Sequence, residues 1–189
     1  IDPCCGTGGF LDHLVDGAAD ADESPDLIGL EILPAPYALA HYRLDQKASD
    51  KGLEGSLRIF LADTLSDELG ETILPVSDPS VFSSELNDAR KPTNEPIMMV
   101  IGNPPVTPRP RSQAPRTIIN GLLEDFRPPP DERKGRGNDQ KALNSEFLRF
   151  LRWSVHKVLS LGDGVVALIV PETFGRTFSY RHARRWLSE

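Results

Sequence analysis

The chain opens with IDPCCGTGGF, residues 1–10, and this stretch decides the fold. Ile1 and Asp2 are typical of the end of a buried strand, and the glycines that follow them indicate a tight turn. Apolar residues then recur at helical intervals over residues 10–19. A strand, a turn and a helix are therefore predicted at the N-terminus.

The same unit recurs along the chain. Leu27–Glu31 is a short apolar run that ends in an acid, and a helical pattern follows it. The further predicted elements are strands over residues 57–63, 97–101 and 165–170 and helices over residues 34–47, 143–161 and 180–187. Two of these strands, 97–101 and 165–170, are apolar enough for burial on both faces. Strands that alternate with helices predict an α/β domain with a mostly parallel sheet and helices on both faces.

Length and composition limit the class of protein. The 189 residues suit one domain, and no apolar run is long enough to cross a membrane. Cys4 and Cys5 are adjacent and are the only cysteines, so we expect neither a disulfide nor a metal site, and a cytoplasmic location. The chain lacks an initiator Met, and we expect it to be truncated at both ends.

The net charge of -7 is unevenly distributed along the chain. Acids dominate the first hundred residues, whereas the loop 104–141 is rich in arginine and lysine. Its basic residues are Arg109, Arg111, Arg116, Arg127, Arg133, Lys134, Arg136 and Lys141. A basic segment on an acidic body can hold a polyanion against one face, although a solvated charged loop has the same composition.

Polar residues and glycines follow the predicted strands at their carboxyl ends. These are Asp2, Gly6, Gly8, Glu31, Asp63 and Asn103. In a parallel sheet such positions meet in one crevice where ligands bind. There Glu31 could accept both hydroxyls of a ribose, and Asp63 could accept from an exocyclic amine. Each residue taken alone also has an ordinary structural explanation, as a turn glycine or an acid that opens a helix or a loop.

The sequence Asn103-Pro104-Pro105 after an apolar strand is the most specific signal. Two prolines fix the backbone and cannot donate hydrogen bonds, so their carbonyls remain free to accept. Rigid acceptors of this kind suit an amine substrate.

Together these motifs resemble a known family. DPCCGTGGF at residues 2–10, with Asn103-Pro104-Pro105 about a hundred residues later, is similar to the first and fourth motifs of the gamma-order DNA adenine-N6 methyltransferases. More specifically, the chain resembles the methyltransferase region of type ISP restriction-modification enzymes. The segments that carry this resemblance are GLEILPAPYALAH at residues 29–41, ADTL at 62–65, EFLRFLR at 146–152 and GVV at 164–166.

The resemblance implies a Rossmann-like S-adenosylmethionine-dependent methyltransferase fold, with the first strand central in the sheet. Residues 1–63 would form the cofactor-binding half and residues 97–189 the catalytic half. Asp2, Gly6 and Gly8 would hold the methionine end of S-adenosylmethionine, Glu31 its ribose and Asp63 its adenine.

In the catalytic half, the resemblance implies that Asn103, Pro104, Pro105 and Val106 receive a target adenine. The substrate would be double-stranded DNA with this adenine flipped out of the stack. Nuclease, helicase-like and target-recognition domains are expected elsewhere in the same parent chain.

Val106 departs from the family pattern, which has an aromatic residue at this position, and the shortening of the first strand to Ile1 and Asp2 is a second departure. Stacking of a base on an aromatic ring contributes about 1–3 kcal/mol, and valine replaces only part of it. Two alternatives stay open. Asn103-Pro104-Pro105 suits flat amide or amine substrates in general, so the first is an N-methyltransferase that acts on protein glutamine or RNA. Val106 motivates the second, a non-catalytic module that binds cofactor and DNA.

Overall fold

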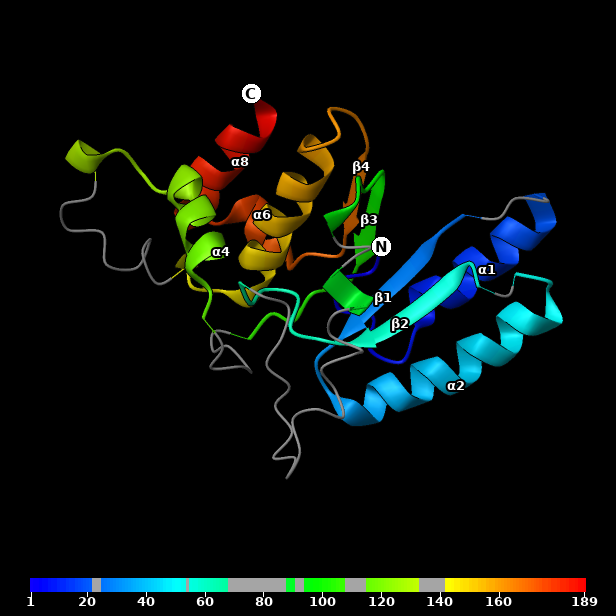
Figure 1. Ribbon diagram of the computed structural model, residues 1–189. Coiled ribbons are helices and arrows are strands. Elements are labelled where there is room, and N and C mark those ends of the chain that lie inside the picture. The colour runs from blue at the N-terminus through cyan, green and yellow to red at the C-terminus, as the bar shows by residue number, and fades with distance from the viewer. Residues whose placement is uncertain (22–24, 54, 68–87, 91–93, 108–114, 133–141) are drawn as a thin grey trace.

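In the computed structural model the chain is an α/β domain (Figure 1). The structure describes residues 1–21, 25–53, 55–67, 88–90, 94–107, 115–132 and 142–189. Its strands are β1 (Leu27–Glu31), β2 (Leu57–Leu61), β3 (Met99–Gly102) and β4 (Val165–Leu168). Its helices are α1 (Gly9–Ala21), α2 (Pro34–Asp50), α4 (Thr117–Leu122), α6 (Glu146–Leu159), α7 (Glu172–Arg176) and α8 (Arg181–Ser188). Short 3-10 helices are η1 (Leu123–Phe126), η2 (Pro130–Glu132) and η3 (Phe178–Tyr180).

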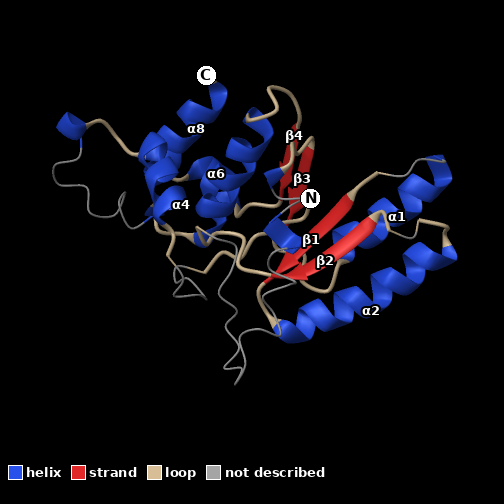
Figure 2. Ribbon diagram, viewed as in Figure 1, coloured by secondary structure: helices blue, strands red, loops and turns tan. Residues whose placement is uncertain are grey.

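Two parallel strand pairs are joined by the N-terminal residues. β1 pairs with β2, and β3 pairs with β4. On one side the Asp2 amide donates to Ile28 O at 2.8 Å, and the Leu30 amide donates to Asp2 O at 2.9 Å. On the other side the Ile1 nitrogen donates to Met99 O at 2.7 Å, and the Ile101 amide donates to Ile1 O at 3.0 Å. The order is therefore β2, β1, residues 1–2, β3, β4, and in Figure 2 the N-terminus lies between the two pairs of red strands.

Side chains of β1 and β2 alternate between two hydrophobic clusters. Leu27 and Ile59 pack against α1 and α2 on one face. Ile28, Leu30 and Phe60 point the other way, into a cluster that contains residues of α4 and α6. This period of two is what a strand requires when both of its faces are covered. The predicted helices on both faces are confirmed for this part of the sheet.

Helix α6 also supports the C-terminal elements. Its Phe147, Leu148 and Leu151 form a third cluster with Phe126 of η1 and Ala183 of α8. Helix α6 can contact both clusters because one stripe of its apolar residues faces the sheet and the adjoining stripe faces α8. The helices predicted over residues 143–161 and 180–187 are thus confirmed, with slightly shifted ends.

The prediction that β3 and β4 are buried on both faces is wrong for the part of the chain that the structure describes. Met98, just before β3, is 71% exposed, and Val165 and Ile169, at the two ends of the predicted strand 165–170, are 54% and 56% exposed. Val100 of β3 is fully buried. Among the described elements, α1 and α2 contact β1 and β2, and this placement of the two helices accounts for the exposure at β3 and β4. Continuous apolar sequence alone could not reveal this difference.

None of the helices in the described ranges is both long enough and apolar enough to span a membrane.

Replacing glycine with alanine should have opposite effects on stability at a packed position in β1, Gly29, and at an open position in α1, Gly17. A Cβ on Gly29 would lie 2.8 Å from both Ile59 and Leu11, so Gly29→Ala should destabilise the fold by about 1–3 kcal/mol through overpacking. Gly17, inside α1, has nothing within 4 Å of such a Cβ, so Gly17→Ala should stabilise it by about 0.5–1 kcal/mol. Urea unfolding followed by tryptophan fluorescence measures both values. Equal effects of the two changes would contradict this packing.

Candidate functional site

The turn after Asp2 brings the backbone to the edge of a cavity. The Cys5 amide donates to Leu30 O, and the Gly6 amide donates to Glu31 Oε2, at 2.9 Å each. Gly6 has a φ of 55°, and a Cβ there would meet nothing within 4 Å, so this position leaves open space beside the backbone. Gly8, with a φ of 86°, is different because its Cβ would collide with Leu44 of α2. Gly6 therefore faces the cavity, and Gly8 serves helix packing.

Glu31 is held rigidly at the end of β1. Its Oε2 accepts from the Gly6 amide at 2.9 Å, and its Oε1 accepts from the Leu33 amide at 2.7 Å. The side chain is buried but lines the cavity. Since each carboxylate oxygen accepts about two hydrogen bonds, each retains capacity for one ligand hydroxyl.

Asp63 follows β2 and is also buried. Its Oδ1 accepts from the Leu65 amide at 3.1 Å and from Arg116 Nη2 at 3.3 Å, and its Oδ2 accepts from the same Nη2 at 3.1 Å. Next to it the Thr64 hydroxyl donates to Pro3 O at 2.5 Å, which ties this turn to the N-terminal turn. The ends of β2 and of the first strand are thereby held together.

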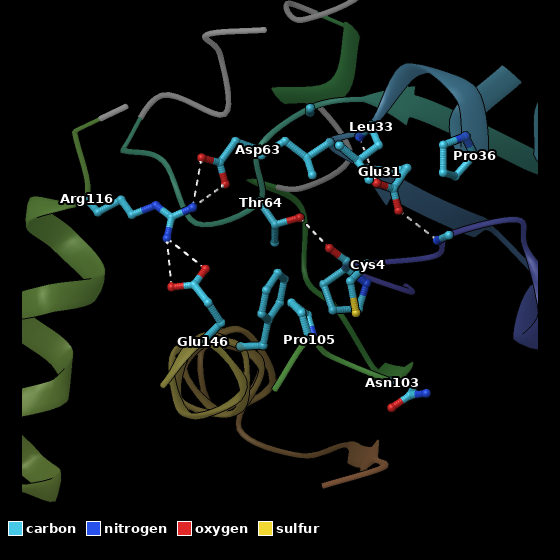
Figure 3. Close-up of a pocket in the computed structure, with 15 residues that line it drawn as sticks. Cys4, Glu31, Leu33, Pro36, Asp63, Thr64, Asn103, Pro105, Arg116 and Glu146 are labelled. Carbon is cyan, nitrogen blue, oxygen red and sulfur yellow. Dashed lines mark hydrogen bonds and ion pairs between the residues drawn. The ribbon is translucent and has the colours of Figure 1, made fainter. Parts of the chain in front are cut away.

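Arg116 connects Asp63 to α6 (Figure 3). Its Nη1 donates to Glu146 Oε2 at 2.9 Å and to Oε1 at 3.1 Å, and Glu146 Oε1 also accepts from Arg149 at 3.0 Å. Desolvation lowers the pKa of Arg116, but the two carboxylates raise it by more, so the guanidinium stays charged. Two buried carboxylates without this cation would be strongly destabilising.

This position of Arg116 corrects one part of the basic-segment prediction. Arg116 is only 9% exposed and points into the protein, so it is not available to a polyanion on the surface. Arg127 pairs with Glu124 at the surface. The other basic residues of the segment, Arg109, Arg111, Arg133, Lys134, Arg136 and Lys141, lie outside the described residues. Composition could not separate Arg116 from them, because the acids that bury it are distant in the sequence.

The cavity has a volume of about 310 Å³ and opens between these turns and α6 (Figure 3). Glu31 and Asp63 lie on its polar walls, and Ile32, Leu33 and Phe150 on its apolar walls. The other lining residues are Pro3, Cys4, Gly6, Pro36, Ala62, Thr64, Asn103, Pro105, Arg116 and Glu146. Flat apolar walls with a few fixed acceptors are typical of a site for a small organic ligand.

A second, more open hollow of about 400 Å³ adjoins the first. Asp2, Phe10 and His13 line it, with Cys5 and Gly9, and it shares Cys4, Gly6 and Asn103 with the first cavity. Burial raises the pKa of Asp2 from 3.8 to about 7, and the charge of Glu31 adds to this effect. A cationic ligand group in this hollow would find a carboxylate that is poised to ionise.

The four residues that follow β3 are placed differently from one another. Asn103 is exposed and lines both hollows, and Pro105 lines the first cavity. Pro104 is buried and Val106 is 56% exposed, and both lie outside the lining that the described residues form. The Thr107 carbonyl accepts from the Glu146 amide at 3.3 Å, which attaches this loop to the start of α6.

The structure thus brings together most of the residues that the sequence singles out. Those that line a hollow are Asp2, Gly6, Glu31, Asp63, Asn103 and Pro105. Sequence reasoning missed Arg116, Glu146 and Phe150 as parts of the site. The motif EFLRFLR contains Glu146 and Phe150, but nothing in it indicates that the first turn of α6 faces the ligand cavity.

Neither a protein-family model nor a curated protein matches the chain, but solved structures do. The cryo-EM structure of the DrdV–DNA complex matches with a TM-score of 0.74 and 24% identity over 98% of this chain. The ATP-dependent Type ISP restriction-modification enzyme LlaBIII bound to DNA matches with a TM-score of 0.72 and 21% identity, again over 98%. A nuclease-deletion mutant of the Type ISP enzyme LlaGI, in complex with a DNA substrate mimic, gives 0.74 and 16% over the same share.

The chain spans 18%, 13% and 18% of these three proteins, in the same order. Identities this low establish similarity of fold. The chain therefore has the α/β fold of one region found in large restriction-modification enzymes.

Proposed function

We propose that this chain is the cofactor-binding and catalytic region of a DNA adenine-N6 methyltransferase within a restriction-modification enzyme. The observation that carries the proposal is the convergence of Glu31, Asp63 and Asn103, from the ends of three strands, on the first cavity, with Asn103 also lining the adjoining hollow. The DNA complexes of the structural neighbours support a nucleic-acid substrate.

The first cavity fits the adenosine part of S-adenosylmethionine. Glu31 offers one remaining acceptor position on each oxygen, as two vicinal ribose hydroxyls require. Asp63 offers an acceptor for an exocyclic amine, and Ile32, Leu33 and Phe150 offer apolar surface for a flat ring. The second hollow, with Asp2 beside the Gly6 backbone, would take the methionine end.

When bound, S-adenosylmethionine would supply an electrophilic methyl group. The side-chain carbonyl of Asn103 and the backbone carbonyl of Pro104 would accept the two hydrogens of the target amine. Such acceptors favour a pyramidal nitrogen whose lone pair points toward the methyl group, and they do so most strongly in the transition state. Asn103 is well placed for this role because it belongs to the wall shared by both hollows.

The target adenine would have to leave the DNA stack to reach Asn103. Val106, three residues after Asn103 in the sequence, is exposed and would offer apolar contact without a ring. This valine is also the observation that favours the second candidate function, a module that binds cofactor and DNA without catalysis. Methylation of protein glutamine or RNA would use the same site chemistry, and the substrates of the experiment below separate these outcomes.

The deciding experiment is Asn103→Ala in the full-length parent protein, with labelled S-adenosylmethionine and DNA, RNA or protein as substrates. We expect methyl transfer to DNA to fall by about 10²–10³-fold, as for loss of other transition-state acceptors or donors, while cofactor affinity stays within about twofold. Asn120→Ala, on the exposed face of α4, is the matched control. A wild-type parent that methylates only protein or RNA, or nothing, would refute the proposal.

A second prediction concerns the ribose site. Glu31→Gln keeps one carbonyl acceptor but removes the other, so the cofactor loses one charge-assisted hydrogen bond, and its affinity should fall at least about tenfold. Calorimetry on the parent measures this, with the exposed Glu124→Gln as the control. Unchanged affinity in Glu31→Gln would remove the ribose from this cavity.

A third prediction follows from Asp2. Its pKa in the folded chain lies above the ordinary value, so the unliganded fold binds more protons between pH 3.8 and about 7 and loses stability as the pH rises through this window. The cofactor ammonium favours the carboxylate form, so cofactor affinity should rise over the same window and level off above it. Asp2→Asn should flatten the profile. Calorimetry at several pH values tests this, and an equally steep profile in Asp2→Asn would contradict it.

A further inference from the structure

Arg116 is held in place from both sides along the chain. The Asp67 amide donates to Pro115 O at 2.9 Å. The Asp67 carboxylate then accepts from the amides of Thr117 and Ile118, both at 2.8 Å, at the start of α4. The backbone on each side of Arg116 is therefore fixed against the segment that follows β2. The point from which the Arg116 side chain projects is consequently fixed before any ligand binds.

The guanidinium of Arg116 divides its donors between two acids. Nη2 serves Asp63 and Nη1 serves Glu146, and all three side chains are more than nine-tenths buried. A planar, forked cation can donate in two fixed directions at once, whereas a lysine ammonium is a point charge on a flexible stem. The geometry at Asp63 therefore depends on arginine itself and on more than its charge.

The arrangement leaves Asp63 with a defined acceptor position. Oδ1 accepts from both the Leu65 amide and Nη2, whereas Nη2 alone reaches Oδ2 among the residues that the structure describes. Oδ2 thus keeps room for one more donor, and Asp63 lines the first cavity. If the Asp63 carboxylate could rotate, the free acceptor position on Oδ2 would point in many directions. The contacts of Arg116 Nη2 with both carboxylate oxygens restrict it to one direction.

We infer that Arg116 is a positioning residue that gives the cofactor cavity its selectivity for an adenine ring, by aiming Asp63 at the exocyclic amine. This inference rests on the proposed function. Glu146 acts as the second anchor that keeps the guanidinium from turning, and Figure 3 shows all three residues on one side of the cavity. A ring with a carbonyl in place of the amine presents an acceptor to an acceptor, and the fixed carboxylate rejects it.

The test compares the dissociation constants of S-adenosylhomocysteine and its inosine analogue in the full-length parent protein. In the inosine compound a carbonyl replaces the exocyclic amine, and the neighbouring ring nitrogen N1 carries a proton. We expect wild type to prefer the adenine compound by at least about tenfold, the equivalent of one net hydrogen bond. Arg116→Lys should reduce this preference to about twofold or less. Arg127→Lys, a surface arginine of the neighbouring segment, is the matched control and should keep the wild-type preference.

The ratio of two dissociation constants isolates the positioning role, because loss of stability weakens both ligands alike. Glu146→Gln gives a second variant that leaves Arg116 paired with Asp63, and its preference should lie between those of wild type and Arg116→Lys. A wild-type preference retained in both variants would overturn the inference. If wild type binds neither compound, the proposed cofactor itself is wrong, which is a different outcome from a wild type that discriminates without Arg116.

Discussion

The structure depends on the insertion of Ile1 and Asp2 between β1 and β3. Four backbone hydrogen bonds, two on each side, join the strand pairs at this point. Without them the chain would consist of a pair β1–β2 covered by α1 and α2 and a separate pair β3–β4 backed by α6. The crevice at the carboxyl ends of the strands exists because these two residues bring the pairs into one sheet.

The same insertion determines the electrostatics of the crevice. Asp2 is buried at the junction, Glu31 ends the adjacent strand and Asp63 ends the next, so three acids gather at one edge of the sheet. The protein neutralises this charge in different ways. Backbone amides serve Glu31, Arg116 serves Asp63 together with Glu146, and burial favours the protonated form of Asp2. Each acid therefore has different partners, which suits a ligand with chemically different ends.

Sequence patterns were sufficient for the longer elements and for Gly6, Glu31, Asp63, Asn103 and Pro105 in the first cavity. The spacing of apolar residues, with glycine and proline at the ends of the elements, located β1, α1 and α2. The rule that the carboxyl ends of parallel strands converge located Glu31, Asp63 and Asn103. They failed where the outcome depended on contacts between distant segments. The exposed face of Met98 and Val165 depends on where α1 and α2 lie, and the burial of Arg116 depends on acids 53 and 30 residues away along the chain. Gly8 looked like Gly6 in the motif, yet only the three-dimensional position of Leu44 separates their roles.

The wall shared by the two hollows has a consequence for chemical probes. Cys4, Gly6 and Asn103 border both spaces, so one elongated molecule that crosses this wall can occupy them together. Such a molecule loses its translational freedom once, whereas two separate ligands lose it twice. With a short flexible linker, the second half of the molecule therefore binds as if it were present at an effective concentration of roughly millimolar. An inhibitor with one group in each hollow would therefore bind far more tightly than either group alone, provided that its linker passes over the shared residues Cys4, Gly6 and Asn103.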